Sequence, residues 1–302
     1  NDGIKKNSHI YRIEVLMLYR RFGRTELSMP VFSCGGMRYQ ESWEDLSLAE
    51  VTTKNQQNLE ATICRALELG INHIETAHMY GTSEIQLGQL LPKLERGSFI
   101  LQSKIAPDAD VAVFRAKLEK SFSRLNVECI DLLSVHGINN DELWSWAPAC
   151  VDVLKEYQKD GRIGHVGFST HADTELISQV IESDLFDYVN LHWYYFLQKH
   201  DRALDLAQKH DMGVFVISPS DKGGRLYDPP EKLKDLCSPY TAMQFNDLFC
   251  LQDPRIHTLS LGAARPSDFD EHVEALAFLG RKEAIDQRGE RIAKELRDVL
   301  GE

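Results

Sequence analysis

Residues 70–81 read GINHIETAHMYG, and within them residues 71–76 form a short apolar run that ends in polar residues and leads into a loop. Apolar runs of similar length recur at residues 30–34, 99–104, 130–136, 165–169, 188–194, 213–218 and 258–262. Continuous apolar runs of this length favour parallel β-strands that are covered on both faces. The sequence therefore predicts eight such strands.

The segments between these runs have the spacing of amphipathic helices. The first apolar stripe consists of Leu59, Ile63, Ala66 and Leu67. A glycine that can end a helix follows it. Strands and helices that alternate eight times over about 250 residues predict an α/β fold, a closed (β/α)8 barrel of the TIM type. The alternative is a doubly wound open sheet, which would carry a G-x-G-x-x-G turn, and Gly35-Gly36 is not that motif.

Several segments lie outside this alternation. Residues 16–30 predict a short hairpin before the first barrel strand, residues 218–240 a long loop after the seventh strand, and residues 281–300 a charged C-terminal helix. No linker or change of composition divides the chain, so we expect a single barrel domain over residues 17–302. Met17 is a candidate natural start, which makes residues 1–16 a candidate N-terminal extension.

The composition restricts the class of partner. A formal net charge of −12 argues against nucleic acid and against an anionic membrane surface, although a few local donors can still hold an anionic cofactor. No apolar stretch approaches the roughly 18 residues of a membrane-spanning helix. The six cysteines contain no C-x-x-C pair, which favours reduced thiols in a cytoplasmic protein over a metal centre.

Polar side chains gather at the carboxyl ends of the predicted strands. Glu75 ends the second strand, Tyr80 follows it, and Lys104 and His136 end the third and fourth. In a closed barrel these ends meet on one face, so we expect an acid, a phenol, an ammonium and an imidazole in one pocket. Each could be structural when taken singly, but buried lysine and glutamate are rare unless they are paired.

The four groups together indicate a particular chemistry. A tyrosine hydroxyl with a pKa of about 10 is a poor acid at neutral pH, and a nearby ammonium lowers that pKa. Glu75 would hold Lys104 in place, and His136 would orient a carbonyl oxygen beside Tyr80. Such a phenol suits proton donation during hydride transfer to a carbonyl, and the hydride must come from a cofactor.

Five motifs together resemble the aldo-keto reductases. YRRFGRT at residues 19–25 resembles the opening hairpin of that family, and residues 70–81 with Ser83-Glu84 resemble the segment around its catalytic tyrosine. Asp131-Leu132-Leu133 before His136 resembles its histidine strand. Residues 164–169 and residues 262–271 resemble strands that hold the two ends of its cofactor. The resemblance covers about residues 18–279 and is greatest to bacterial reductases with Gly-Gly-Met-Arg, here residues 35–38.

The resemblance implies a role for each matching position. Tyr80 would be the general acid, Lys104 the partner that lowers its pKa, His136 the group that orients the carbonyl, and Glu75 the acid at a position where the family usually has aspartate. NADP or NAD would be the cofactor and a small-molecule carbonyl compound the substrate. The cofactor-binding residues would be Gly36, Met37, Ser169, Thr170, Asn190, Ser218, Pro219, Lys222, Gly224, Arg225, Gly262, Ala264, Arg265, Asp268, Glu271 and His272.

Several positions depart from the family pattern. Asn190 is shorter than the glutamine often found there, and Thr170 replaces an asparagine. Glu75 is one methylene longer than aspartate, although it keeps the carboxylate, so we expect its pairing with Lys104 to survive. Ile217 stands where many relatives stack an aromatic ring on the nicotinamide. Asp268 would repel a 2′-phosphate and accept from a free ribose hydroxyl, whereas Arg265 would favour the phosphate, so the residues leave NADP and NAD open.

Two other functions remain open at this stage. Barrels of this family also serve as cofactor-bound regulatory or subunit modules with little turnover, and Glu75 and Ile217 fit a weak enzyme. A metal-dependent hydrolase would use the histidines near the strand ends, but their spacing gives neither H-x-H nor H-E-x-x-H. The identity of the substrate and the oligomeric state cannot be read from the residues.

Overall fold

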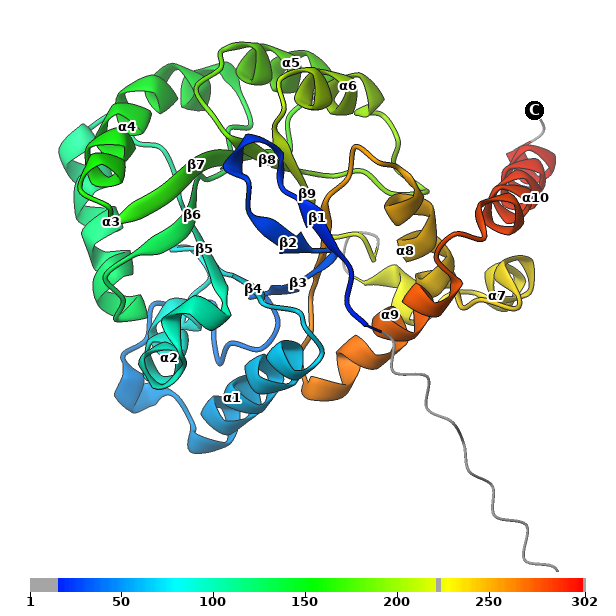
Figure 1. Ribbon diagram of the computed structural model, residues 1–302, viewed down its shortest axis with the longest axis horizontal. Coiled ribbons are helices and arrows are strands. Elements are labelled where there is room, and N and C mark those ends of the chain that lie inside the picture. Colours follow the sequence, from blue (N-terminus) through cyan, green and yellow to red (C-terminus); the bar gives the residue numbers. More distant parts are fainter. Residues whose placement is uncertain (1–15, 221–223, 301–302) are drawn as a thin grey trace, which may run out of the picture.

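A computed structural model describes residues 16–220 and 224–300, so the predicted cofactor residue Lys222 and all but the last residue of the candidate extension, residues 1–16, lie outside the described residues. Eight parallel strands close into a barrel, with helices around its outside (Figure 1). The strand order is β10-β3-β4-β5-β6-β7-β8-β9, and each neighbouring pair is parallel. The predicted barrel is therefore confirmed.

Each predicted apolar run overlaps one barrel strand. The strands are β3 (Phe32–Gly35), β4 (His73–Glu75), β5 (Ile100–Ile105), β6 (Ile130–Val135), β7 (Ile163–Ser169), β8 (Tyr188–Leu191), β9 (Gly213–Val216) and β10 (Thr258–Leu261). Helices α1 (Thr53–Glu68), α2 (Ser83–Leu90), α3 (Val111–Leu125), α4 (Asp141–Lys159), α5 (Thr174–Glu182) and α6 (Asp201–Lys209) cover the outside. The core lies between the two layers, because both sets of elements bury apolar side chains there.

The predicted N-terminal hairpin is present and closes one end of the barrel. Strand β1 (Tyr19–Arg21) pairs antiparallel with β2 (Ser28–Pro30). The hairpin lies across the barrel in Figure 1, and its Phe22 and Met29 pack against Leu132, Tyr188 and Phe215. The amino-terminal end of the barrel is thus filled, and the carboxyl ends of the strands form the other, open end.

The segment after β9 differs from its prediction as one long loop. It contains a short 3-10 turn, Arg225–Tyr227, and a helix, α7 (Glu231–Cys237). Leu233 and Leu236 of α7 pack on a second apolar cluster formed with α8 (Ala242–Gln252) and α10 (Lys282–Leu300). The loop prediction was wrong for residues 231–237, because two leucines three positions apart are too short a stripe to reveal a helix that depends on a distant partner.

The C-terminal helix is confirmed as α10, and Ile285 and Ile292 are buried in the second cluster. A short helix, α9 (Asp270–Ala275), precedes it. All six cysteines are unpaired thiols. Within residues 16–220 and 224–300, no helix is long and apolar enough to cross a membrane.

Helices α2 and α3 approach closely at Gly88, where an added Cβ would overlap the Arg124 carbonyl oxygen. We expect Gly88→Ala to lower the free energy of unfolding by about 1–3 kcal/mol, because the helices must separate. Gly97→Ala is the matched control, since a Cβ there meets nothing within 4 Å, and its effect should stay within about 0.5 kcal/mol. Urea denaturation of both variants measures the difference, and equal effects would contradict this packing.

Candidate active site

A cavity of about 460 Å³ opens at the carboxyl ends of the strands, and all four predicted catalytic side chains line it. Glu75 ends β4, Lys104 lies near the end of β5, and His136 directly follows β6. Tyr80 comes from the loop between β4 and α2. The grouping that barrel topology predicted is therefore present.

Lys104 is the centre of the polar contacts in this cavity. Its ammonium forms a direct ion pair with Glu75, and both side chains are buried. It also donates to the Thr76 carbonyl at 2.9 Å and to the Tyr80 hydroxyl oxygen at 3.2 Å. The other carboxylate oxygen of Glu75 accepts from the Gly36 amide at 3.2 Å. The longer acid thus keeps the pairing that we expected.

The electrostatics differ from the expectation in one respect. Burial raises the pKa of the Tyr80 phenol above its ordinary value. Burial also acts to lower the pKa of Lys104, whereas the Glu75 carboxylate in direct contact with it favours the charged ammonium. Burial therefore opposes the lowering of the Tyr80 pKa that we expected from Lys104, and that lowering stays a prediction. Tyr80 is a neutral phenol at physiological pH, and its hydroxyl lies 3.4 Å from the Glu75 carboxylate.

His136 faces Tyr80 across the cavity. The two rings meet edge to face with centroids 5.9 Å apart. Burial, reinforced by Lys104, His171 and His78, lowers the pKa of His136 to about 3. Its Nδ1 atom has no hydrogen-bond partner among the described residues. His136 is consequently a neutral imidazole that lines the cavity beside Tyr80.

A tight turn fixes Tyr80 in this position. The Tyr80 amide donates to the Ala77 carbonyl at 3.0 Å, and the His78 amide donates to the Lys104 carbonyl at 3.0 Å. Gly81 has a φ of +50° and no room for a Cβ, which would overlap the Ser42 carbonyl oxygen. Glycine is needed here for both reasons.

The two ends of the predicted cofactor site differ in how well they are formed. Ser169 lines the cavity and pairs in register with Asn190, whose buried carboxamide has no partner among the described residues. Such an orphaned amide fits another amide group, as on a nicotinamide ring. Thr170 instead turns away, since its hydroxyl donates to the Ile138 carbonyl at 2.7 Å.

At the other end, several predicted residues are engaged with one another. Asp268 accepts from the Ala264 amide and from Arg265 Nε, each at 2.9 Å. His272 is buried against Asp247 at 2.5 Å, beneath the surface. The predicted residues that line the cavity are Met37, Ser169, Ser218, Gly224 and Gly262, whereas the lining does not include Gly36, Thr170, Asn190, Pro219, Arg225, Ala264, Arg265, Asp268, Glu271 or His272.

The cavity also has walls that sequence reasoning missed, comprising Gly35, Arg38, Trp43, His171, Ser220 and Ser260. Arg38 donates to the Gly262 carbonyl at 3.2 Å and lies over the Tyr227 ring at 5.1 Å. In this loop the sequence predicted cofactor contacts only at Gly36 and Met37. The large aromatic side chain of Trp43 in the same loop was a signal for a further wall of the cavity. Within the described residues, no group of three or more His, Cys, Asp or Glu side chains could hold a metal ion.

The chain thus forms a barrel in which a buried lysine–carboxylate pair lies beside a half-buried tyrosine and a facing histidine. A family model described as the aldo/keto reductase family matches residues 32–286. The chain therefore belongs to the aldo/keto reductase family.

The chain is also similar to individual oxidoreductases in sequence and to a solved aldo-keto reductase in structure. An uncharacterized oxidoreductase, YqkF, of Bacillus subtilis is 26% identical over 59% of this chain and 63% of its own length. The NADH-specific methylglyoxal reductase of Escherichia coli is 25% identical over 54% of this chain and 56% of its own. The chain thus spans less than two thirds of these relatives. An aldo-keto reductase from Klebsiella pneumoniae, solved with NADP and acetate, has a TM-score of 0.74 at 21% identity over 90% of this chain and 94% of that one, which shows the shared fold.

Glu75→Gln should be strongly destabilising, because it leaves the Lys104 ammonium buried without its counter-charge. We expect the free energy of unfolding to fall by about 3–5 kcal/mol. Glu75→Asp keeps the charge and should cost clearly less. Urea denaturation of the two variants tests this, and a Glu75→Gln protein as stable as Glu75→Asp would contradict the charge pairing.

Stability should fall in mild acid. Burial lowers the pKa of His136 and His73 to about 3 and of His78, His200 and His257 to about 4. Below about pH 6.5 these histidines therefore bind protons in the unfolded chain but stay neutral in the folded chain. The stability that these groups contribute is complete above that pH and is lost as the pH falls, by up to about 1.4 kcal/mol per pH unit and histidine.

The contribution of His136 can be separated by substitution. Between pH 7.5 and 5.5, His136→Gln should lose about 1 kcal/mol less stability than the unchanged protein. Urea midpoints at the two pH values measure this loss, and equal losses would show that folding does not lower the pKa of His136.

Proposed function

We propose that this protein is an oxidoreductase that reduces an aldehyde or ketone with NADH or NADPH, and that Tyr80 is the proton donor. The observation that carries the proposal is the Tyr80 hydroxyl, held 3.2 Å from the Lys104 ammonium in the cavity of an aldo/keto reductase barrel. No other phenol lines this cavity within the described residues.

Several groups support a nicotinamide cofactor. Ser169 and the orphaned amide of Asn190 would hold the carboxamide of its ring, and Ser218, Gly224 and Gly262 would line the rest of the groove. Bound NADH or NADPH supplies the hydride. The Escherichia coli relative is named for NADH and the Klebsiella structure contains NADP, so the choice is a matter for titration.

The side chains divide the work of the reaction. A carbonyl oxygen placed between Tyr80 and the neutral His136 accepts hydrogen bonds from both, which fixes it and polarises it. Tyr80 then gives its proton to that oxygen as negative charge develops there. The phenolate left behind is stabilised by Lys104, and Glu75 holds Lys104 in place. Burial of the group strengthens each of these interactions.

Tyr80→Phe removes the proton donor and leaves the walls of the groove unchanged. We expect kcat/KM for aldehyde reduction to fall by about 10²–10⁴-fold, while the dissociation constants of NADPH and NADH stay the same. Fluorescence titration measures cofactor binding, and loss of cofactor absorbance with a panel of aldehydes measures turnover. Unchanged turnover would disprove this role of Tyr80, and tight cofactor binding by the unchanged protein without any turnover would favour a regulatory or subunit module instead.

A further inference from the structure

The loop between β3 and α1, residues 36–52, crosses the turn that carries Tyr80 and is anchored there. The Thr82 amide donates to the Ser42 carbonyl at 3.0 Å. In return, the Glu41 and Ser42 amides donate to the Thr82 hydroxyl at 3.1 and 3.2 Å. These reciprocal bonds fix the loop on the N-terminal side of Trp43.

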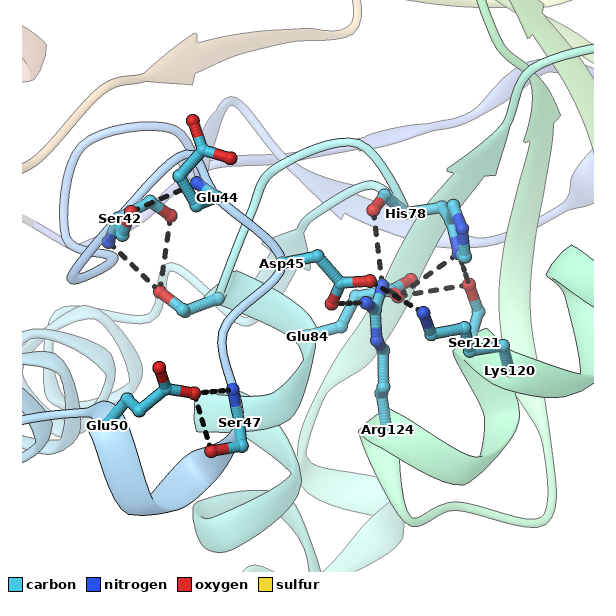
Figure 2. Close-up of polar contacts among 11 residues, drawn as sticks. Ser42, Glu44, Asp45, Ser47, Glu50, His78, Glu84, Lys120, Ser121 and Arg124 are labelled. Atoms are coloured by element: carbon cyan, nitrogen blue, oxygen red, sulfur yellow. Dashed lines mark hydrogen bonds and ion pairs between the residues drawn. The ribbon is translucent and has the colours of Figure 1, made fainter.

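A second anchor lies on the other side of Trp43 and consists of Asp45, Lys120 and Arg124, which we call the clamp (Figure 2). Lys120 Nζ lies 2.6 Å from Asp45, and Arg124 forms an ion pair with the other carboxylate oxygen. Both cations come from the C-terminal half of α3. Asp45 is the only loop residue between 42 and 47 that forms an ion pair among the described residues.

Arg124 also connects the clamp to the catalytic elements (Figure 2). Its side chain is only 8% exposed, and it donates to the His78 carbonyl at 3.4 Å and lies 3.6 Å from the buried Glu84 carboxylate. Glu84 accepts in turn from the hydroxyl of Ser103, the neighbour of Lys104 on β5, at 2.6 Å. The His78 carbonyl and the Glu84 carboxylate thus fix the Arg124 guanidinium, and Asp45 binds to a cation that is already held in place.

Trp43 lies between the two anchors, at the mouth of the cavity. Its ring meets the Tyr80 ring edge to face with centroids 6.0 Å apart. Trp43 lines the cavity and is 57% exposed. Met37 also lines the cavity, and it is 43% exposed. Large apolar side chains that remain exposed beside a reacting group mark a surface for a ligand.

We propose that Trp43 is a specificity-determining residue for carbonyl substrates with an aromatic body, and that the clamp is the device that positions it. This inference rests on the proposed carbonyl reduction. An aromatic ring held against the exposed indole lies within reach of Tyr80, because the indole itself packs against that side chain. Asp45 touches no reacting atom and has its ion pairs with Lys120 and Arg124 of α3, so it acts through the position of Trp43.

The test compares benzaldehyde with propanal, using whichever reduced cofactor binds. We expect Trp43→Ala to raise the KM for benzaldehyde about three- to ten-fold, which corresponds to one lost aromatic contact, and to affect propanal less. Asp45→Asn should also raise the KM for benzaldehyde. Its kcat and its turnover of propanal should stay within about two-fold of those of the unchanged protein. Trp43→Phe should restore most of the benzaldehyde affinity.

The double variant decides whether the clamp works through Trp43. In the Trp43→Ala background, Asp45→Asn should have no further effect on the ratio of the two KM values, because coupled residues are not additive. Glu156→Gln is the matched control, since it removes an exposed carboxylate that pairs with Arg115 of α3 at 2.6 Å, far from the loop in the chain, and it should change neither KM.

Each outcome bears on one of the two claims. An unchanged KM ratio in Trp43→Ala, or an Asp45→Asn effect of equal size in both backgrounds, overturns this inference while carbonyl reduction stands. Absence of reduction of both aldehydes by the unchanged protein overturns the proposed function instead. Thermal unfolding of each variant separates a change in loop position from a loss of the fold.

Discussion

The ion pair between Lys104 and Glu75 is the interaction on which the rest of the site depends. An ammonium inside a barrel is costly unless a carboxylate and further acceptors surround it. Here Glu75 comes from β4 and Lys104 from β5, and Glu75 also accepts from the Gly36 amide after β3. One pair therefore ties three neighbouring strands together at the end where the cavity opens.

The same burial decides the protonation states of the site. It keeps Tyr80 a neutral phenol and His136 a neutral imidazole, so both groups can offer hydrogen bonds to an uncharged carbonyl oxygen. In the proposed reaction, charge would appear on Tyr80 only when its proton leaves, and Lys104 already lies 3.2 Å from the Tyr80 oxygen. Preorganised charge of this kind needs no rearrangement at the moment of reaction.

The sequence predicts the barrel and the catalytic group for a topological reason. Parallel strands in a closed barrel must end on one face, so Glu75, Lys104 and His136 converge wherever the loops run. The path of a loop carries no such constraint. Asp45 meets Arg124 across 79 positions of sequence, and no spacing rule predicts that contact. Asp268 and Arg265 lie close in sequence, yet whether they bind a ligand or each other depends on side-chain geometry.

We propose that Tyr80 and Lys104 act as one catalytic unit. The most direct test is a double-mutant cycle that measures kcat/KM for aldehyde reduction in Tyr80→Phe, Lys104→Met and the double variant. We predict that the double variant is no slower than Tyr80→Phe alone, because Lys104 would act only through the Tyr80 oxygen. Losses that multiply would contradict it and would show that Lys104 contributes to the reaction by another route.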